Sequence, residues 1–265
     1  MMGGENGKQR GDDAPPPGDG PEAAVRRGSA APLPKRFYKT ASVEARDGGF
    51  ALLLDGRGVK TPGKRALVLP TRAFADAVAE EWMAQGERVD PTTMPLTRIA
   101  NTAIDAVAEN MDAVAADIVA FAGSDLLCYR ATAPEGLVTR QSEAWDPLLA
   151  WAKDELGAPL ETVAGVMPVV QRTEALAGVA SALEELGPFA LAALHVMTTL
   201  AGSAVIGLAH ARGRLPLEEA WASAHVDEDW QIEQWGEDAE AAARRVRRRA
   251  EFAAASRAFF LATET

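Results

Sequence analysis

The sequence predicts an α+β protein, in which hairpins and helices share the first half of the chain and helices fill the second. Short apolar runs between residues 50 and 69 alternate with turn signals, which is typical of antiparallel strands. Beyond residue 125 nearly every segment has helical periodicity instead. A chain of 265 residues, 48% of them apolar, is long enough for one large or two small domains with a packed core.

Residues 50–69 have the pattern of a β-meander. The apolar run 50–54 indicates a strand, and Asp55-Gly56 is a strong hairpin turn signal. Residues 59–61 can pair back, Pro62-Gly63 turns the chain again, and 66–69 follow as a further strand.

Within this meander, residues 58–64 match the G-x-x-x-x-G-K part of a nucleotide-binding P-loop. Arg65 stands where that motif needs Ser or Thr to hold magnesium, and Pro62 removes one backbone amide from the loop. A strand-like run follows, whereas a P-loop opens a helix. The pattern therefore favours a hairpin over a nucleotide site.

Two helices are predicted in the rest of the first half. Thr71 is a candidate N-cap, and apolar residues recur at helical spacing over 74–85. Residues 94–97 break the pattern, and a second helix is expected over about 100–121.

Four helical segments are predicted in the second half, over 141–156, 174–186, 189–209 and from Pro216 onward, where the helix can continue into an acidic stretch. The uncharged run 189–209 is long enough to span a membrane. It is rich in Ala and contains His195, so a helix buried at the centre of a bundle fits better.

The composition limits the classes of partner and compartment. A net charge of -11 argues against nucleic-acid and anionic-membrane binders. The single cysteine, Cys128, lies in an apolar setting, which favours a buried structural thiol in a reducing compartment over a nucleophile. Because residues 1–33 lack an apolar signal segment and carry acids, we expect a cytoplasmic bacterial protein with a disordered N-terminal tail.

The segment 227–240 is the most informative of the chain. It holds seven acids and two tryptophans and no base. An acidic surface with aromatic side chains is suited to binding another protein, whereas it would repel the phosphates of a nucleic acid. On one continuous helix, Trp235 and Asp238 would share a face. The alternative is a solvated helix whose tryptophans belong to the core. The basic run 244–249 is expected to be a solvated or ion-paired face.

No recognisable catalytic constellation appears in the sequence. The three histidines, His195, His210 and His225, lie in different segments without metal-ligand spacing, and Cys128 has no evident histidine partner. We therefore expect no cofactor, no metal and no enzymatic activity. This pattern favours a binding function.

Several short motifs occur in a fixed order over about residues 35–240. They are Arg36-Phe37-Tyr38-Lys39, Leu54-Asp55-Gly56-Arg57, Lys60-Thr61-Pro62, Glu81-Trp82, Gln85, Met94-Pro95-Leu96-Thr97, Asp125-Leu126-Leu127-Cys128-Tyr129-Arg130, Gln141, Trp145-Asp146-Pro147-Leu148-Leu149, Gln231 and Trp235-Gly236. Taken together, they resemble one family, the assembly chaperones of the F1 part of ATP synthase that act on its α subunit (the F1 complex assembly factor 2 type).

This resemblance implies an N-terminal two-layer α/β domain over 34–130 and an orthogonal helix bundle over 131–258. It also implies a monomeric chaperone that binds the free α subunit transiently and shields its β-facing surface until β arrives. The family occurs in mitochondria and in α-proteobacteria. Two rival functions stay open: an enzyme with a small-molecule site in the inter-domain cleft, and a permanent subunit of a larger assembly.

Five residues of the acidic segment are the candidates for contacting the α subunit: Glu233, Trp235, Gly236, Glu237 and Glu240. Arg57, Lys60 and Arg98 are further candidates for surface contacts. Trp82 is predicted to be structural, anchoring the first helix on the sheet.

Overall fold

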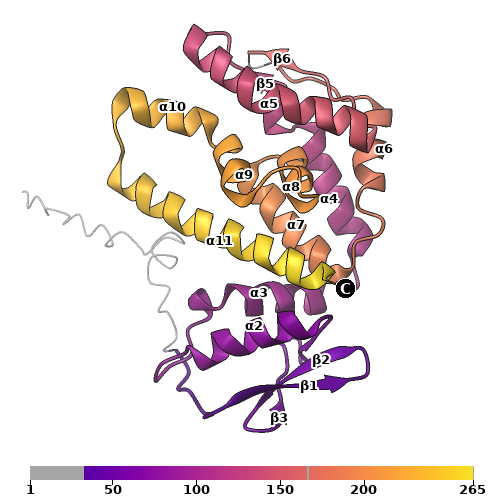
Figure 1. Cartoon of the computed structure of the whole chain (residues 1–265), viewed down its shortest axis with the longest axis vertical. Helices are drawn as coiled ribbons and strands as arrows, with labels where there is room; N and C mark the ends of the chain where they lie inside the picture. Colours follow the sequence, from indigo (N-terminus) through magenta and orange to yellow (C-terminus); the bar gives the residue numbers. More distant parts are fainter. Residues whose placement is uncertain (1–32, 166, 265) are drawn as a thin grey trace, which may run out of the picture. The chain divides into compact units, whose positions relative to one another are not determined.

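The computed structural model describes residues 33–165 and 167–264, and those from Lys35 onward form one compact unit. The tail predicted over 1–33 lies outside the described residues, Leu33 excepted. A strand-containing N-terminal region leads into a helical C-terminal region, which confirms the predicted fold class (Figure 1). One apolar core runs from Leu52 in the sheet to Phe259 in the last helix. The division near residue 130 stays a prediction.

The described part contains a four-stranded sheet built around β2 (Gly49–Leu54). Along its length β2 pairs antiparallel with β1 (Ala41–Arg46), and its other edge pairs with β3 (Arg57–Gly58) and β4 (Val68–Leu69). Asp55 and Gly56 have φ of 47° and 76°, so the predicted β2–β3 turn is confirmed. Strand β1 was not predicted, because its inward residues are small and its outward residues are polar.

Helix α2 (Arg72–Met83) covers one face of this sheet. Thr71 caps it as predicted, since its hydroxyl accepts a hydrogen bond from the Phe74 amide at 3.1 Å. The helix buries Phe74 and Val78 in the core that also contains Leu52 of β2. This packing gives the N-terminal region its two layers (Figure 1).

The single helix predicted over 100–121 is wrong. The chain forms α3 (Pro95–Thr102), a π-helical turn (Ala103–Val107) and then α4 (Met111–Gly123), after a short 3-10 turn at Pro91–Thr93. Pro95 therefore opens a helix where a break had been expected, as proline does in a first helical turn.

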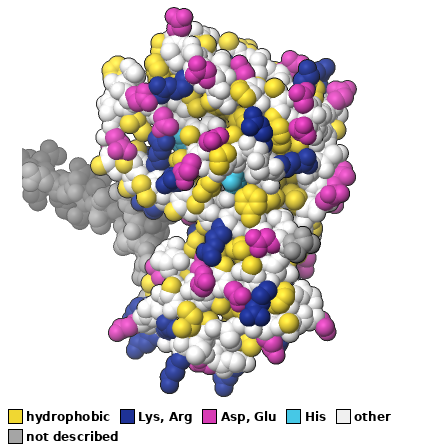
Figure 2. Space-filling view, in the orientation of Figure 1, with side chains coloured by type: hydrophobic (Ala, Val, Ile, Leu, Met, Phe, Trp, Pro, Cys, Tyr) yellow, Lys and Arg dark blue, Asp and Glu magenta, His cyan; other side chains and the backbone are white. Residues whose placement is uncertain are grey.

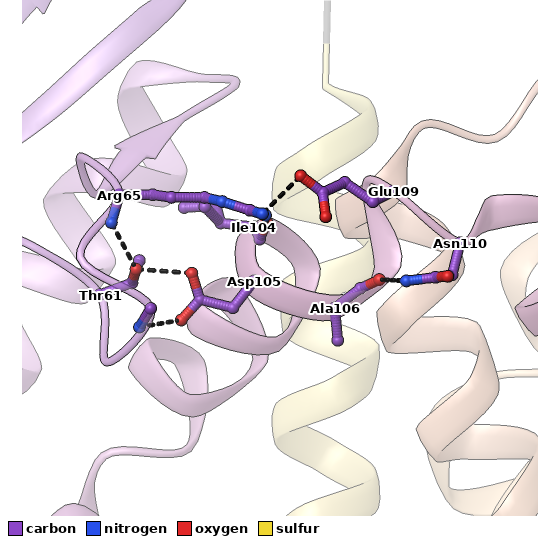
Figure 3. Close-up of polar contacts among 8 residues, drawn as sticks. Thr61, Arg65, Ile104, Asp105, Ala106, Glu109 and Asn110 are labelled. Atoms are coloured by element: carbon purple, nitrogen blue, oxygen red, sulfur yellow. Dashed lines mark hydrogen bonds and ion pairs between the residues drawn. The ribbon is translucent and has the colours of Figure 1, made fainter.

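Tertiary contacts explain the interruption between α3 and α4 (Figure 3). The Asp105 carboxylate accepts hydrogen bonds from the Thr61 hydroxyl at 2.6 Å and the Gly63 amide at 2.7 Å. Arg65 donates to the Ile104 carbonyl and pairs with Glu109. The hairpin over 58–64 is thus bound to the π-helical turn, which confirms a hairpin in place of a P-loop.

The helical region begins with a short 3-10 turn (Leu126–Cys128) and α5 (Glu135–Leu156), followed by α6 (Thr173–Ser181). Two short strands that were not predicted, β5 (Tyr129–Arg130) and β6 (Val163–Ala164), pair in parallel beside α5. The helix predicted over 174–186 begins one residue later and ends five residues later than α6 does.

The apolar run 189–209 forms two buried helices, α7 (Pro188–Ala201) and α8 (Ala204–Ala211), where one was expected. Gly202, with φ of 67°, ends the first, and the Ser203 hydroxyl caps the second. The prediction that the run 189–209 is buried at the centre of the helical region is confirmed. In the part of the chain that is described, no helix combines the length and hydropathy needed to cross a bilayer.

The last predicted helix is also divided, into α9 (Leu217–Ser223), α10 (Val226–Trp235) and α11 (Ala239–Thr263). Helix α11 packs along α7 and also reaches α3 and α2 of the N-terminal region (Figure 1). A helix from the end of the sequence therefore joins the two regions.

Asp125 joins segments that are distant in the sequence. Its buried carboxylate accepts hydrogen bonds from the Leu127 and Val205 amides, both at 3.1 Å. Burial raises the pKa of Asp125 to about 6 and that of its neighbour Cys128 to about 12. Cys128 is fully buried, which confirms the structural thiol.

Candidate functional site

The acidic segment forms helix α10 and the corner that follows it, and polar contacts attach this helix to α5. Arg140 makes two hydrogen bonds of 2.8 Å to the Glu233 carboxylate, and Gln141 donates to Asp227 at 2.7 Å. The pairing with Arg140 holds the pKa of Glu233 below its usual range. Glu233, one of the five predicted contact residues, therefore already has a partner within the chain.

Trp230 adds an aromatic contact to this attachment. The Arg140 guanidinium lies 5.1 Å from the centre of the Trp230 ring, and a Cβ at Gly136 would come within 2.7 Å of the ring edge. Val226 is the one fully buried residue of α10, so the helix has no extended apolar face. The contacts with α5 therefore do most to hold it in place. Arg140 and Gly136 were not predicted, because they lie about ninety residues before α10 and carry no local signal.

Helix α10 ends where the predicted continuous helix would have gone on. Gly236 has φ of 84° and ψ of 170°, a combination open almost only to glycine. Asp238 then caps α11 by accepting from the Ala241 amide at 2.8 Å. Asp238 therefore does not share a helical face with Trp235, which corrects the sequence prediction.

The α10–α11 corner, residues 233–240, presents most of the predicted contact residues to solvent. Trp235 is 87% exposed, and Gly236, Glu237 and Glu240 are exposed beside it. A groove of about 370 Å³ runs between the helices and is lined by Trp235, Glu237 and Arg248, among others. Trp230 is half-buried against Gly136 and Arg140, whereas Trp235 projects into solvent. Contact of Trp235 with a partner stays a prediction.

The basic run 244–249 is ion-paired, as predicted. Arg245 pairs with Asp229 of α10, Arg249 with Glu218, and Arg244 lies 3.9 Å from Glu240. Arg248 donates at 2.9 Å to the carbonyl of Leu200 near the end of α7. Glu237 has no ion pair or hydrogen bond among the residues that the structure describes, so its charge is available to a partner.

The arrangement at the corner suits protein binding more than catalysis. The groups whose pKa burial raises most, Asp125 and Cys128, are core residues and line neither this groove nor the one between α10 and α5. Over residues 33–264, residue 166 apart, no cluster of His, Cys, Asp and Glu has the geometry of a metal site.

The geometry of Gly236 leads to a first testable prediction. Gly236→Ala is expected to cost about 1–3 kcal/mol, because alanine is strained at this φ and ψ. Thermal unfolding measures the loss. Gly86→Ala is the matched control, since Gly86 has open space around it and no positive φ, and it should be neutral. Equal melting temperatures for the two variants would contradict the role of Gly236 in the corner.

Comparison with known proteins identifies the family. The family model described as ATP12 chaperone protein matches residues 35–153. The mitochondrial protein atp12 of Schizosaccharomyces pombe is 27% identical over 224 residues, which cover 78% of this chain and 77% of that protein.

Two solved structures are similar in fold and sequence. Atp12 from Paracoccus denitrificans superposes with a TM-score of 0.82 at 47% identity, covering 86% of this chain and 98% of that one. A protein from Agrobacterium tumefaciens described as a candidate chaperone gives 0.84 at 53% identity, covering 86% of both chains. The chain belongs to the ATP12 chaperone family.

Proposed function

We propose that this protein is an assembly chaperone of the F1 sector of ATP synthase, which binds the free α subunit until β replaces it. The observation that carries the proposal is the α10–α11 corner, where an almost fully exposed tryptophan stands among exposed acids at a fixed turn, and one of those acids, Glu237, has no partner among the described residues. Aromatic side chains in a polar rim are typical of protein–protein hot spots. Membership of a chaperone family supports a protein client.

The client chemistry follows from what a ring subunit exposes before assembly. Its subunit interface is apolar and prone to aggregation until the neighbouring subunit covers it. A chaperone must cover that surface and still leave. In this proposal Trp235 supplies the apolar anchor, and Glu237 and Glu240 pair with bases on the client.

Glu233 and Gly236 act indirectly in the same proposal. Glu233 is held by Arg140, so it fixes the direction of α10. Gly236 permits the turn that presents Trp235 and Glu237 together. The chain acts as a monomer, without a cofactor, in the bacterial cytoplasm.

The first test is capture of purified α and β subunits by the full chain, each alone and then together, without nucleotide. Capture of free α and its release on addition of β support the proposal. Failure to capture α overturns it. Co-purification with the finished synthase at fixed stoichiometry would instead favour a permanent subunit.

Charge reversal at the corner gives the second testable prediction. Glu237→Arg with Glu240→Arg is expected to weaken binding of the α subunit about 10- to 100-fold, since like charges at an interface repel. Isothermal titration calorimetry measures the affinity. The matched control is Glu184→Arg with Glu185→Arg, an exposed pair remote in sequence from the corner. If both double variants bind equally, the corner is not the contact surface.

The alternative function is an enzyme that acts on a small molecule. It requires a cleft that gathers titratable groups with shifted pKa values. The shifted groups of this chain lie in the core or are held in structural hydrogen bonds, as Glu81 is by the Leu96 and Thr97 amides. The family model and the Agrobacterium tumefaciens structure are both described as chaperones, which favours binding over catalysis.

A further inference from the structure

A second candidate surface, remote in sequence from the α10–α11 corner, lies in the N-terminal region where α2 ends beside the sheet. It is a hollow of about 580 Å³ between the segment 37–38, the β2–β3 hairpin and the end of α2. Phe37, Tyr38, Arg57, Lys60 and Trp82 line it, and together they are called the Phe37 hollow.

Phe37 is presented outward by its two neighbours. Arg36 donates to the Gln85 carbonyl past the end of α2, and the Tyr38 hydroxyl donates to the Trp82 carbonyl at 2.6 Å. Tyr38 is therefore 4% exposed while Phe37 is 75% exposed. An aromatic ring held out by anchored neighbours can bind with little further loss of conformational entropy, as hot-spot aromatics do.

The wall of the hollow is aromatic. The Tyr38 and Trp82 rings are in contact, with centres 5.5 Å apart, and both residues line the hollow. The indole N–H of Trp82 is itself buried, without an acceptor in the described part of the chain, so the wall offers an apolar surface and no accessible donor from this ring.

The rim of the hollow is positively charged. Arg57 and Lys60 are exposed and make no ion pair with any described residue. The nearby acid, Asp55, is occupied by the Lys39 and Thr40 amides and the Thr40 hydroxyl, and these hydrogen bonds lower its pKa.

The N-terminal region around the hollow is nearly neutral, whereas the helical region is acidic. Residues 35–110 carry 11 bases and 10 acids, whereas residues 111–265 carry 12 bases and 23 acids. Figure 2 shows Lys and Arg side chains projecting at the lower end of the molecule, over the strands. The two surfaces therefore select different ligands: the corner favours bases and the hollow favours acids.

We infer that the Phe37 hollow is a second client-binding surface, which takes an extended acidic segment carrying one apolar side chain. The apolar side chain packs on Phe37 and Tyr38, while carboxylates of the segment pair with Arg57 and Lys60. The inference rests on the proposed function, since the client is the same α subunit. Two surfaces of opposite charge would fix the client's orientation, which one surface cannot do alone.

The test measures binding of purified α subunit to the full chain and its variants. Phe37→Ser, and separately Arg57→Glu with Lys60→Glu, are expected to weaken binding about tenfold or more. Two matched controls should bind normally: Val170→Ser, which removes an apolar side chain that is 89% exposed, and Lys153→Glu, an exposed charge reversal on α5. Melting temperatures confirm that each variant is folded.

The outcomes separate the inference from the proposed function. If Phe37→Ser binds like the unchanged chain while reversal of Glu237 and Glu240 abolishes binding, the hollow inference is overturned and the chaperone proposal stands. If the unchanged chain does not bind α, both fail.

A photo-crosslinking amino acid in place of Phe37 identifies the occupant. A crosslink to an acidic segment of α supports the inference, and a crosslink to a basic or uncharged segment overturns it. A second copy of this chain is the competing occupant, because its own corner is acidic and carries Trp235. Sedimentation that finds self-association lost in Phe37→Ser, with no crosslink to α, would overturn client binding in the hollow.

Discussion

Replacing Asp125 with alanine is expected to lower the free energy of unfolding by about 3 kcal/mol, a large share of a typical domain's stability. The carboxylate is fully buried and satisfies the amides of Leu127, two residues on, and of Val205, eighty residues on. Without it, both donors stay buried and unpaired, and the start of α8 loses its attachment to the 3-10 turn. Urea unfolding measures the change.

Asp117→Ala is the matched control for this variant. Asp117 also has a partner, at 2.6 Å from the His195 ring, but its side chain is 57% exposed. Exposed ion pairs contribute about 0–1 kcal/mol, so the control should lower the free energy of unfolding by no more than about 1 kcal/mol. Equal losses in the two variants would show that Asp125 does not join α8 to the rest of the chain.

The raised pKa of Asp125 also predicts a pH dependence. Since burial raises it from 3.8 to about 6, the folded state binds a proton more tightly than the unfolded state. Its contribution to stability is therefore fully present below about pH 4 and is lost as the pH rises through about 6. Relative to Asp125→Asn, the unchanged chain should gain stability between pH 7 and pH 4. A difference between the two that does not vary with pH would contradict this sign.

Trp82→Arg is expected to destabilise the protein by about 3 kcal/mol or more, through lost packing and a cation with no acidic partner. The ring packs beside the buried residues Tyr38, Leu54 and Met94, at the contact between α2 and the N-terminal segment. Arg57 and Lys60, which line the same hollow as Trp82, would oppose a further positive charge. Thermal and urea unfolding measure the loss.

Trp82→Phe isolates the charge effect. Phenylalanine keeps an aromatic ring and deletes an N–H that has no acceptor among the described residues, so the loss should be no more than about 1 kcal/mol. A normal melting temperature for Trp82→Arg would refute the structural role that the sequence predicts for this tryptophan.

Features that depend on a few adjacent residues were predicted correctly. Asp55-Gly56 makes a tight turn whatever lies around it, and Thr71 caps α2 through an amide three residues away. Cys128 was correctly expected to be buried because its neighbours are apolar. Helix ends were predicted less well, since Asp105 draws the π-helical turn onto a hairpin more than forty residues earlier.

The candidate site shows the same division. Its acids and tryptophans are visible in the sequence, but Trp230 packs on Gly136 while Trp235 projects into solvent. Helical spacing placed Trp235 and Asp238 on one face, whereas the backbone of Gly236 separates them. Phe37 was noticed only as part of a motif, because its exposure depends on contacts that Arg36 and Tyr38 make with α2.

The sequence by itself determined the fold class, the strand-forming region, the caps and turns, the acidic segment and the resemblance to a chaperone family. Each of these depends on composition, on local hydrogen bonds or on short periodicity, which act within a few residues. Only the tertiary structure decided where long helices divide, which tryptophan is exposed and which charges stay unpaired. Those outcomes depend on contacts between residues such as Arg140 and Glu233, which chain folding brings together and no local pattern records.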